Sequence, residues 1–443
     1  MGKILLIFPE LEKNKQLHHI PLSVLAIAAP LEHRGIKYEI FDERVDGYDK
    51  LESKLEDVAI VGITMFTGHQ TSRAYEILNK IKSIDNTIII VAGGPHVTSL
   101  PEQILASELV NYVVVGYGDE VFCKLVECII NQGTAQGNKI PGIGYLDADG
   151  SITINKELNA VGNDYWHNLP YNKIDINKYI NPATELVMYV TTYGCPGKCT
   201  FCATPCTRTW IQKPIELVIS DLKFLYDQYQ FKQIVFNDAT LLASKKRTFE
   251  IIGSLKKFPN VEWCAFSRAD EIIKYSKEEL ERIKTTGGEL ISLTVGLESG
   301  SQRVATEIMK RGRNHLAKFE ECIRKLVDVS IPVVSGLIFG IPGDTPDDVR
   351  TTIEYISQIR KIYPGFRLSS TFFRPLPGTE LYYSLKLSGF ELPCSFKEWA
   401  SYAERNHYTY NEWNDIFWMS EKEKEEYRKA YDRFLERHGS ILI

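Results

Sequence analysis

Two long series of short apolar runs, separated by helical patterns, constrain the fold of this chain most strongly. In the first series the runs begin at positions 3, 37, 58, 87 and 112, are rich in β-branched residues and do not alternate with polar ones. Runs of this kind are typical of parallel strands that helices bury on both faces. Residues 1–132 therefore predict a Rossmann-like α/β domain.

The second series starts at Glu185 and contains six strand-like runs with helical segments between them. The runs are "LVMYVTTYG", "QIVFND", "VEWCAFSRA", "ISLTVGLES", "VVSGLIFG" and "RLSSTFFRP". Two helix starts are explicit, because Ser276 and Glu279 have the spacing of a capping box and Thr345 precedes Pro346. Six such units without a reversal signal predict an open or closed parallel barrel.

The 443 residues are too many for one ordinary domain, and the pattern divides them into four parts. We expect the Rossmann-like domain over 1–132, a linker with a small hairpin over 133–184, a partial (β/α)6 TIM-type barrel over 185–385, and an aromatic-rich helical region over 386–443. The hairpin is predicted from "PGIGYLDADGSITIN", and the last helix from a start at Ser420 and an end at Gly439.

Charge and hydropathy narrow the class of protein. The chain has 52 basic and 57 acidic residues, so its net charge of −5 gives no reason to expect nucleic acid or an anionic membrane as a partner. The apolar stretch after Met1 is too short for a signal peptide, and no later run reaches the roughly 18 apolar residues of a membrane span. We therefore expect a cytoplasmic protein whose cysteines are reduced.

Four of the nine cysteines lie between 195 and 206 in "CPGKCTFCATPC". Structural zinc usually takes two separated pairs of cysteines, and an electron-transfer iron–sulfur cluster takes four cysteines. The group Cys195, Cys199 and Cys202 would leave one iron of a 4Fe–4S cluster without a protein ligand, free for a substrate or cofactor. Cys206 is either a fourth ligand or a bystander. The spacing predicts a metal centre.

The spacing Cys195-x3-Cys199-x2-Cys202, with Phe201 directly before the third cysteine, resembles the signature of the radical S-adenosylmethionine (SAM) superfamily. The resemblance implies a 4Fe–4S cluster held by the three cysteines, whose open iron chelates SAM. One electron would then cleave SAM to methionine and a 5′-deoxyadenosyl radical, which abstracts hydrogen from a substrate. In this chemistry the protein supplies orientation and exclusion of water.

Other segments of the second series resemble the same superfamily. "LTVGLESGSQRV" resembles its fourth-strand motif, which makes Glu298 and Ser299 candidate SAM contacts, and Arg268 matches a position that meets the SAM carboxylate. The purely structural alternatives are that Glu298 and Ser299 end a strand and cap the next helix, and that Arg268 is an ordinary surface arginine. Two positions depart from the family, since Ala239 stands where a second aspartate follows Asp238, and Asp344 replaces a glutamate.

The first series resembles the cobalamin-binding domain that precedes many radical SAM enzymes. Loops at the carboxyl ends of its strands would form the cofactor crevice. A nucleotide or flavin is the competing ligand, but no G-x-G-x-x-G follows the first strand, and the D-x-H-x-x-G cobalt-ligand motif is absent as well. His69 either reaches cobalt or caps a helix. The resemblance implies these cobalamin contacts: Thr64, Met65, Phe66, Gly93, Gly94, Pro95, His96, Gly116, Gly118 and Glu120.

The combination resembles cobalamin-dependent radical SAM methyltransferases. It implies that a substrate carbon radical takes a methyl group from methylcobalamin, which a second SAM regenerates, and that the two domains face each other. Cyclisation, ring rearrangement or oxidation without methyl transfer stays open. A methylthiotransferase is the lesser alternative, because Cys123 and Cys128 are spaced as core residues of a helix and do not supply the three cysteines of its second cluster.

Substrate and partners follow only in outline. We expect a small-molecule substrate, with a peptide possible, a flavodoxin- or ferredoxin-type reductant, no nucleic acid and no membrane span. The aromatic segment from Trp399 to Trp418 is either a lid or substrate wall, or packing against the open bottom of the barrel.

Overall fold

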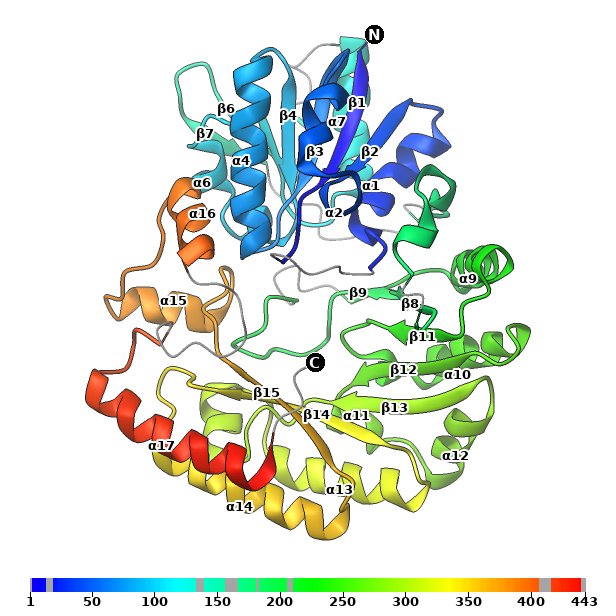
Figure 1. Ribbon diagram of the computed structural model, residues 1–443, viewed down its shortest axis with the longest axis vertical. Coiled ribbons are helices and arrows are strands. Elements are labelled where there is room, and N and C mark those ends of the chain that lie inside the picture. The colour runs from blue at the N-terminus through cyan, green and yellow to red at the C-terminus, as the bar shows by residue number, and fades with distance from the viewer. Residues whose placement is uncertain are drawn as a thin grey trace. The chain divides into compact units, whose positions relative to one another are not determined.

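The computed structural model describes residues 2–12, 19–132, 139–155, 166–180, 183–204, 210–405 and 416–439. The chain forms two compact units (Figure 1). The first contains Met1–Asn181 and Glu391–Tyr408, and the second contains Pro182–Phe390 and Thr409–Ile443. The chain therefore leaves the second unit, contributes a segment to the first, and returns. The domain limits at 132, 184 and 385 stay predictions.

The sheet of the first unit has the strand order β2-β1-β3-β4-β5-β6-β7. Its first five strands are parallel, and the order changes direction at β1, which lies between β2 and β3. The hairpin β6–β7 continues the sheet because β6 pairs antiparallel with β5. The strands are β1 (Lys3–Phe8), β2 (Tyr38–Asp42), β3 (Val58–Thr64), β4 (Ile89–Gly93), β5 (Tyr112–Val114), β6 (Ile143–Leu146) and β7 (Ile152–Ile154).

Helices cover both faces of this sheet, which confirms the α/β prediction. One core lies against α1 and α7, and the other lies against α3, α4, α5 and α6 and also contains Phe396 of α16. In α4, Ile77, Leu78 and Ile81 are fully buried, and burial of one such side chain contributes about 1.5–3 kcal/mol. The helices are α1 (Leu22–His33), α2 (Glu43–Asp46), α3 (Leu51–Lys54), α4 (His69–Ile84), α5 (Pro95–Ser99), α6 (Pro101–Leu105), α7 (Asp119–Gln132) and α16 (Phe396–Arg405).

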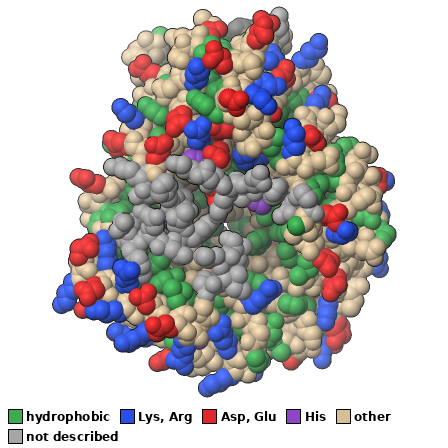
Figure 2. Space-filling view, viewed as in Figure 1, with side chains coloured by type: hydrophobic (Ala, Val, Ile, Leu, Met, Phe, Trp, Pro, Cys, Tyr) green, Lys and Arg blue, Asp and Glu red, His purple; other side chains and the backbone are tan. Residues whose placement is uncertain are grey.

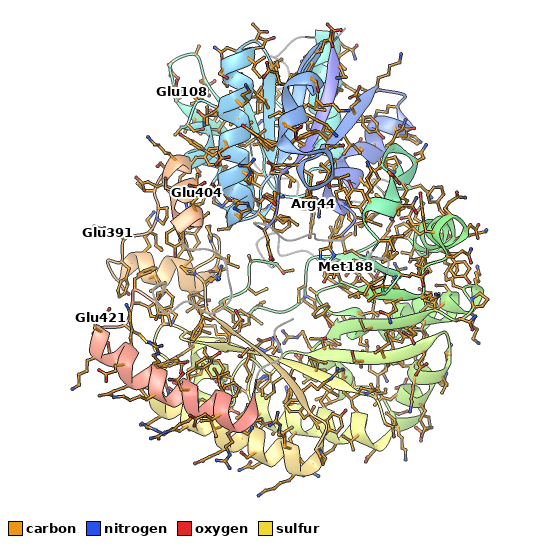
Figure 3. All side chains as sticks on the ribbon, viewed as in Figure 1. Arg44, Glu108, Met188, Glu391, Glu404 and Glu421 are labelled. Atoms are coloured by element: carbon orange, nitrogen blue, oxygen red, sulfur yellow. The ribbon has the colours of Figure 1, made fainter. Side chains whose placement is uncertain are left out.

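Arg44 of α2, labelled in Figure 3, fixes the chain beyond the end of β2. Its Nε donates to Asp42 Oδ1 over 2.9 Å and its Nη2 to Asp42 Oδ2 over 2.6 Å, a bidentate ion pair. The guanidinium also lies over the rings of Phe8 and Tyr179, at 4.4 and 5.6 Å from their centroids. One cation thus joins the ends of β1 and β2 to the short helical turns near 176.

The second unit contains six parallel strands in the order of the chain, with β8 and β15 at the two edges. This is the open form of the predicted barrel. The strands are β8 (Leu186–Tyr189), β11 (Gln233–Phe236), β12 (Glu262–Ser267), β13 (Glu289–Val295), β14 (Val333–Phe339) and β15 (Arg367–Phe372). A two-stranded ribbon, β9 (Thr192–Tyr193) and β10 (Ile211–Gln212), brackets the cysteine loop.

The helices of the second unit begin largely where the sequence predicts. Ser276 and Glu279 form a capping box, and Thr345 forms another with Asp348 ahead of Pro346. Ser420 caps the last helix, which ends at Gly439. The helices are α9 (Ile215–Tyr229), α10 (Lys245–Ser254), α11 (Ala269–Ile272), α12 (Lys277–Thr285), α13 (His315–Asp328), α14 (Pro346–Ile362), α15 (Glu380–Leu387) and α17 (Glu421–His438).

The last helix, α17, covers the end of the sheet at β14 and β15. Its buried Tyr431 contacts the rings of Phe339 and Phe372, with centroids 5.0 and 4.9 Å away, and Phe434 contacts Phe339 at 4.9 Å. Since α14 also packs against α17, this edge of the sheet is buried by a helix from the C-terminal region.

Surface charge agrees with the composition. Basic and acidic side chains are intermixed on the face drawn in Figure 2. Among the described residues, no helix is both long and apolar enough to cross a membrane.

Candidate functional site

The strand that leads to the cysteines is held by one buried carboxylate. Asp238, two residues after β11, accepts hydrogen bonds from the backbone N and the hydroxyl of Thr191, at 3.1 and 2.8 Å, and from the hydroxyl of Thr192 at 2.6 Å. Burial raises the pKa of Asp238, while these donors act in the opposite direction. Ala239, where the family places a second aspartate, is exposed. Asp238 therefore anchors the start of the cysteine loop.

The loop presents three partly buried thiols. The backbone N of Gly197 donates to Sγ of Cys195 over 3.3 Å, and the N of Cys202 donates to the carbonyl of Cys199 over 3.3 Å. Burial raises the pKa of the Cys202 thiol, and the neighbouring Cys199 and Cys195 raise it further. Phe201 is partly buried beside them. Cys206 lies outside the described residues.

Two arginines converge on Sγ of Cys199. Arg268, which follows β12, donates through Nη1 over 3.5 Å, and Arg311 donates through Nη1 over 3.3 Å. Arg268 is held by a bidentate pair with Asp270, at 2.9 Å from both Nε and Nη2. A Cβ at Gly197 would come within 2.5 Å of Arg268 Nη1, so the glycine makes this approach possible. Arg268 thus faces the cysteines, where the sequence places a SAM contact.

Arg311 is a site residue that the sequence argument missed. It follows a π-helical turn, Val304–Ile308, and its Nη2 donates to the carbonyl of Gly296 over 2.8 Å. Its Nε is buried without a hydrogen-bond partner in the part of the chain that the structure describes. The run "MKRGRN" contains several basic residues and no periodicity that distinguishes this one. Only the fold joins position 311 to position 199.

Glu298 lies on a strained backbone at the carboxyl end of β13. Its φ of +67° is in the left-handed region, which is unfavourable for a residue with a Cβ. Its backbone N donates to the carbonyl of Gly336 over 2.9 Å, and its own carbonyl accepts from Ile338 over 2.8 Å. A Cβ at Gly296 would come within 2.1 Å of Glu298 Oε1. Burial raises the pKa of Glu298, although Arg311 and Arg268 act to lower it.

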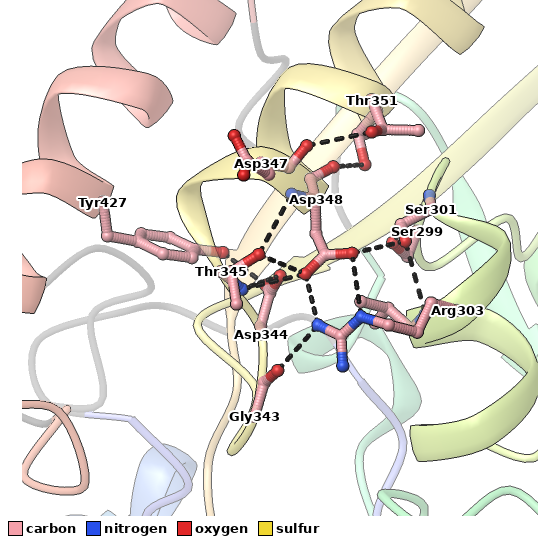
Figure 4. A network of polar contacts seen from close by, with 12 residues as sticks. Ser299, Ser301, Arg303, Gly343, Asp344, Thr345, Asp347, Asp348, Thr351 and Tyr427 are labelled. Atoms are coloured by element: carbon pink, nitrogen blue, oxygen red, sulfur yellow. Dashed lines mark hydrogen bonds and ion pairs between the residues drawn. The ribbon is translucent and has the colours of Figure 1, made fainter.

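Ser299 begins a polar network that runs to α17 (Figure 4). Its hydroxyl accepts from the backbone N of Ser301 over 3.1 Å, and the Ser301 hydroxyl donates to Asp348 Oδ1 over 2.6 Å. Asp348 also forms an ion pair with Arg303, and it completes the capping box of α14, in which Thr345 is the N-cap. The adjacent Asp344 accepts from the hydroxyl of Tyr427 in α17. The network therefore holds the chain that follows Ser299 against the start of α14.

The donor set fits a cluster better than a single ion. No three His, Cys, Asp or Glu side chains among the described residues are placed to hold one metal ion. In a 4Fe–4S cubane each thiolate binds a different iron, so three ligands on one loop need not converge on a point. Three thiols, two cations and a buried carboxylate would surround such a cluster and a bound amino acid group. These residues therefore fit the cluster and SAM.

In the first unit, the loops after β3 and β4 interlock. The backbone N of Met65 donates to the carbonyl of Gly93 over 2.9 Å, and the N of His96 donates to the carbonyl of Met65 over 3.1 Å. Gly94 has φ of +98°, and a Cβ there would lie 2.8 Å from Thr64 Oγ1. Only glycine fits that position. Thr64, Met65 and the run 93–96 are therefore one structure at the carboxyl ends of neighbouring strands.

Two side chains of these loops are suited to contact a ligand. Phe66 is 44% exposed although its backbone is held in place, because its N donates to Gln70 Oε1 over 2.8 Å. His96 is fully buried, and burial lowers its pKa to about 3. Its Nδ1 lies 2.9 Å from Thr67 Oγ1, while its Nε2 has no hydrogen-bond partner among the residues described. Such an orphaned buried nitrogen is what a polar atom of a bound cofactor would satisfy.

The remaining candidates of this unit have structural partners. Gly116, with φ of +86°, donates through its N to Thr98 Oγ1 over 3.1 Å, and a Cβ at Gly118 would come within 3.1 Å of Ile27. Glu120 forms an ion pair with Arg34. His69 begins α4 and pairs with Glu10 over 3.1 Å. Cys123 is buried in the core and Cys128 is partly buried on the same helix, as their spacing predicts.

The aromatic segment divides between the two units. Trp399, on α16, is buried in the first unit. Trp418 belongs to the second, where its Nε1 donates over 2.9 Å to the carbonyl of Gly340 at the carboxyl end of β14. Its ring contacts Phe373 and Phe417. Residues 406–415 lie outside the described residues. Trp418 therefore lies at the carboxyl end of β14, in the same sheet as the strand that leads to Glu298.

Known proteins match both halves. The radical SAM superfamily model matches residues 189–356, and the B12 binding domain model matches residues 14–126. An uncharacterized methyltransferase of Pyrococcus horikoshii is 27% identical over 331 residues, 74% of this chain and 69% of that protein. The cytidylyl-2-hydroxyethylphosphonate methyltransferase of Streptomyces wedmorensis is 22% identical over 435 residues, 84% of this chain and 79% of that protein.

A solved structure has the same fold. It is the radical SAM methyltransferase TsrM of Kitasatospora setae with cobalamin and a 4Fe–4S cluster bound, with a TM-score of 0.70 at 16% identity over 87% of this chain and 75% of that one. The two family matches cover the two parts whose geometry is described above, the cysteine loop with its arginines and the interlocked loops of the parallel sheet. The chain belongs to the cobalamin-dependent radical SAM enzymes, which use a 4Fe–4S cluster, SAM and cobalamin.

Proposed function

We propose that this enzyme methylates an unactivated carbon of a small molecule. The observation that carries the proposal is the joint presence of a three-cysteine loop faced by two arginines and, in the other unit, interlocked loops where the buried Nε2 of His96 has no partner among the described residues. The methyltransferase names of its relatives support methyl transfer. When bound, the cluster and SAM supply a 5′-deoxyadenosyl radical, and cobalamin supplies the methyl group.

The residues of the second unit would hold and orient the cluster and SAM. Cys195, Cys199 and Cys202 are the proposed iron ligands. Glu298 and Ser299 lie at the carboxyl end of β13, where Gly296 leaves room for the carboxylate, and we assign both to SAM. Arg268 and Arg311 place two positive charges at Cys199, which favour the anionic state of a reduced cluster.

The residues of the first unit would hold cobalamin. Gly93, Gly94 and Pro95 would bring the backbone close to the cofactor, and the buried His96 Nε2 would offer it one polar contact. Phe66 presents an exposed apolar side chain on the neighbouring loop, and Met65, whose side chain is buried in the core, would support that loop. Thr64, Gly116, Gly118 and Glu120 complete the set, although Glu120 would first have to leave Arg34.

Substrate and partners belong to the same proposal. Trp418, Phe373 and Phe417 form an aromatic group at the carboxyl edge of the sheet and would supply a wall for an apolar or aromatic small molecule. A flavodoxin- or ferredoxin-type protein would supply the electron, and the cytoplasm would supply the reducing conditions that free cysteines need. We propose no nucleic acid partner, because charges of both signs are intermixed on the surface drawn.

The proposal can be tested without knowing the substrate. The reconstituted enzyme, with hydroxocobalamin and a strong reductant, is incubated with SAM carrying a trideuterated methyl group, and the products are analysed by mass spectrometry. We expect labelled methylcobalamin and 5′-deoxyadenosine. Replacing all three cysteines by alanine should abolish the deoxyadenosine. Deoxyadenosine without labelled methylcobalamin would instead favour cyclisation, rearrangement or oxidation.

A further inference from the structure

The helix α16 belongs physically to the cobalamin-binding unit, far beyond the residues that match the B12-binding family model. Phe396 is fully buried in the core beneath the sheet and meets the ring of Tyr75 of α4, with centroids 5.1 Å apart. At the other end of the helix, the hydroxyl of Ser72 donates to Glu404 Oε1 over 3.0 Å. Figure 3 labels Glu404 on α16 beside α4. The helix is thus fixed at both ends.

Between these two ends, Trp399 reaches the loop after β4. It is 1% exposed, and its Nε1 donates to Gln103 Oε1 of α6 over 3.1 Å. Its ring meets the imidazole of His96 nearly edge to face, with centroids 5.4 Å apart and an interplanar angle of 80°. An arrangement of this kind is attractive and directional. Trp399 therefore packs directly against the ring of His96.

The hydrogen bonds of His96 alone do not fix the orientation of its ring. Among the described residues, the imidazole makes one hydrogen bond, between Nδ1 and Thr67 Oγ1, and its Nε2 has no partner. Because burial keeps the ring neutral, only one of its nitrogens carries a proton. If the Thr67 hydroxyl donates to Nδ1, Nε2 is a donor that can meet an amide or phosphate oxygen of a bound molecule.

We propose that Trp399 is a positioning residue for cobalamin, which acts by holding His96 and the loop 93–96 in the conformation that binds the cofactor. The inference rests on the proposed cobalamin site and adds to it a contribution from a helix some 300 residues further along the chain. It also gives the C-terminal aromatic segment two separate tasks, one at Trp399 and one at Trp418.

The test is calorimetric titration of the full-length chain with hydroxocobalamin. We expect Trp399→Leu to weaken binding by about tenfold, a change of about 1.4 kcal/mol. Trp399→Phe keeps a ring against His96 and should restore most of the affinity. Phe396→Leu is the matched control, since it loosens the same helix from the core without removing the contact with His96. It should lower thermal stability and leave the affinity nearly unchanged.

A double-mutant cycle separates positioning from general stability. In a His96→Ala background, Trp399→Leu should have little further effect on the dissociation constant of cobalamin. Additive effects of the two substitutions, or equal losses in Trp399→Leu and Phe396→Leu, would overturn the inference while cobalamin binding stands. Failure of the unsubstituted chain to bind cobalamin would overturn the proposed function itself.

Discussion

Arg311 and Cys199 are 112 positions apart in the chain, yet Arg311 Nη1 donates a hydrogen bond to Cys199 Sγ over 3.3 Å. Arg268 reaches the same sulfur from another strand over 3.5 Å. Neither Cys195 nor Cys202 has such a cation among its hydrogen bonds in the described residues. One ligand of the proposed cluster is therefore electrostatically distinct from the other two.

The reduction potential of the cluster should depend on this pair. Replacing Arg311 by glutamine removes a positive charge next to the sulfur, which destabilises the reduced, more anionic cluster. We expect the midpoint potential to fall by an amount on the order of 50 mV, measured by redox titration with EPR detection in the absence of SAM. Arg311→Lys should recover part of the shift. An unchanged potential at full iron content would contradict the role of Arg311.

Iron incorporation should depend on Asp238. Replacement by alanine leaves the Thr191 N–H and the hydroxyls of Thr191 and Thr192 without their acceptor, at about 1–3 kcal/mol for each buried donor left unpaired. The cysteine loop should then lose its anchor, and iron per chain after reconstitution should fall to below about half. Asp238→Asn keeps an oxygen for the two hydroxyls and should fall in between.

Cobalamin binding is the internal control for that experiment. It depends on the other unit, so Asp238→Ala should bind hydroxocobalamin as the unsubstituted chain does. Parallel loss of both iron and cobalamin would mean that the substitution unfolds the chain, and normal iron would mean that Asp238 does not anchor the loop.

The side chain of Glu298 should lower the free energy of unfolding and strengthen the binding of SAM. Its φ of +67° suits glycine, so Glu298→Gly should be more stable than Glu298→Ala by about 1 kcal/mol, measured by chemical denaturation. Both variants lack the carboxylate and should bind SAM weakly. Glu298→Gln, which keeps the shape, should bind SAM roughly tenfold more weakly at unchanged iron content. Equal stability of the glycine and alanine variants would show that the backbone is not strained.

The contribution of Asp344 to the free energy of unfolding should fall as the pH rises from about 4 to about 7. Burial raises its pKa to about 7, and the raised value means that the folded chain holds a proton that the unfolded chain releases. The stabilisation is fully present below the ordinary pKa of aspartate and is lost as the pH passes about 7. The difference in unfolding free energy between the chain and Asp344→Asn should change by ~4 kcal/mol across this window.

Groups around Asp344 modulate the effect. The Tyr427 hydroxyl lowers the pKa, so Tyr427→Phe should extend the pH window upward, whereas Asp348 raises it. Asp347 is the control residue, since its side chain is 85% exposed and pairs with Arg350 on the surface of α14. Asp347→Asn should leave the pH dependence unchanged, and a pH-independent difference in unfolding free energy between the unsubstituted chain and Asp344→Asn would contradict the assignment.

Local patterns predicted the elements and the cysteine loop. The strands follow runs of β-branched residues, and the capping boxes at Ser276 and Ser420 are readable from four consecutive residues. The close approach of Gly94 to bound cobalamin stays a prediction, and the structure shows its close approach to Thr64 and Met65. The strands and the capping boxes depend on interactions within a few residues of each other, which sequence determines directly.

The contacts that the sequence did not predict are all long-range. Arg311 at Cys199 and Trp399 at His96 involve residues that no periodicity or spacing links. The hairpin β6–β7 was predicted within a linker, but its pairing with β5 required the sheet to be formed. Arg268 was predicted at SAM, and it faces Cys199 because Asp270 holds its guanidinium there. Such arrangements follow from packing of distant elements.

The central claim is that one chain holds both a radical SAM cluster and cobalamin. Its most direct test is the amount of iron and cobalt per chain, by elemental analysis after anaerobic reconstitution with hydroxocobalamin and desalting. We predict about four iron and one cobalt, with the iron lost and the cobalt kept when all three cysteines are replaced by alanine. About four iron without cobalt would contradict the account, since the Rossmann-like unit would then not bind cobalamin.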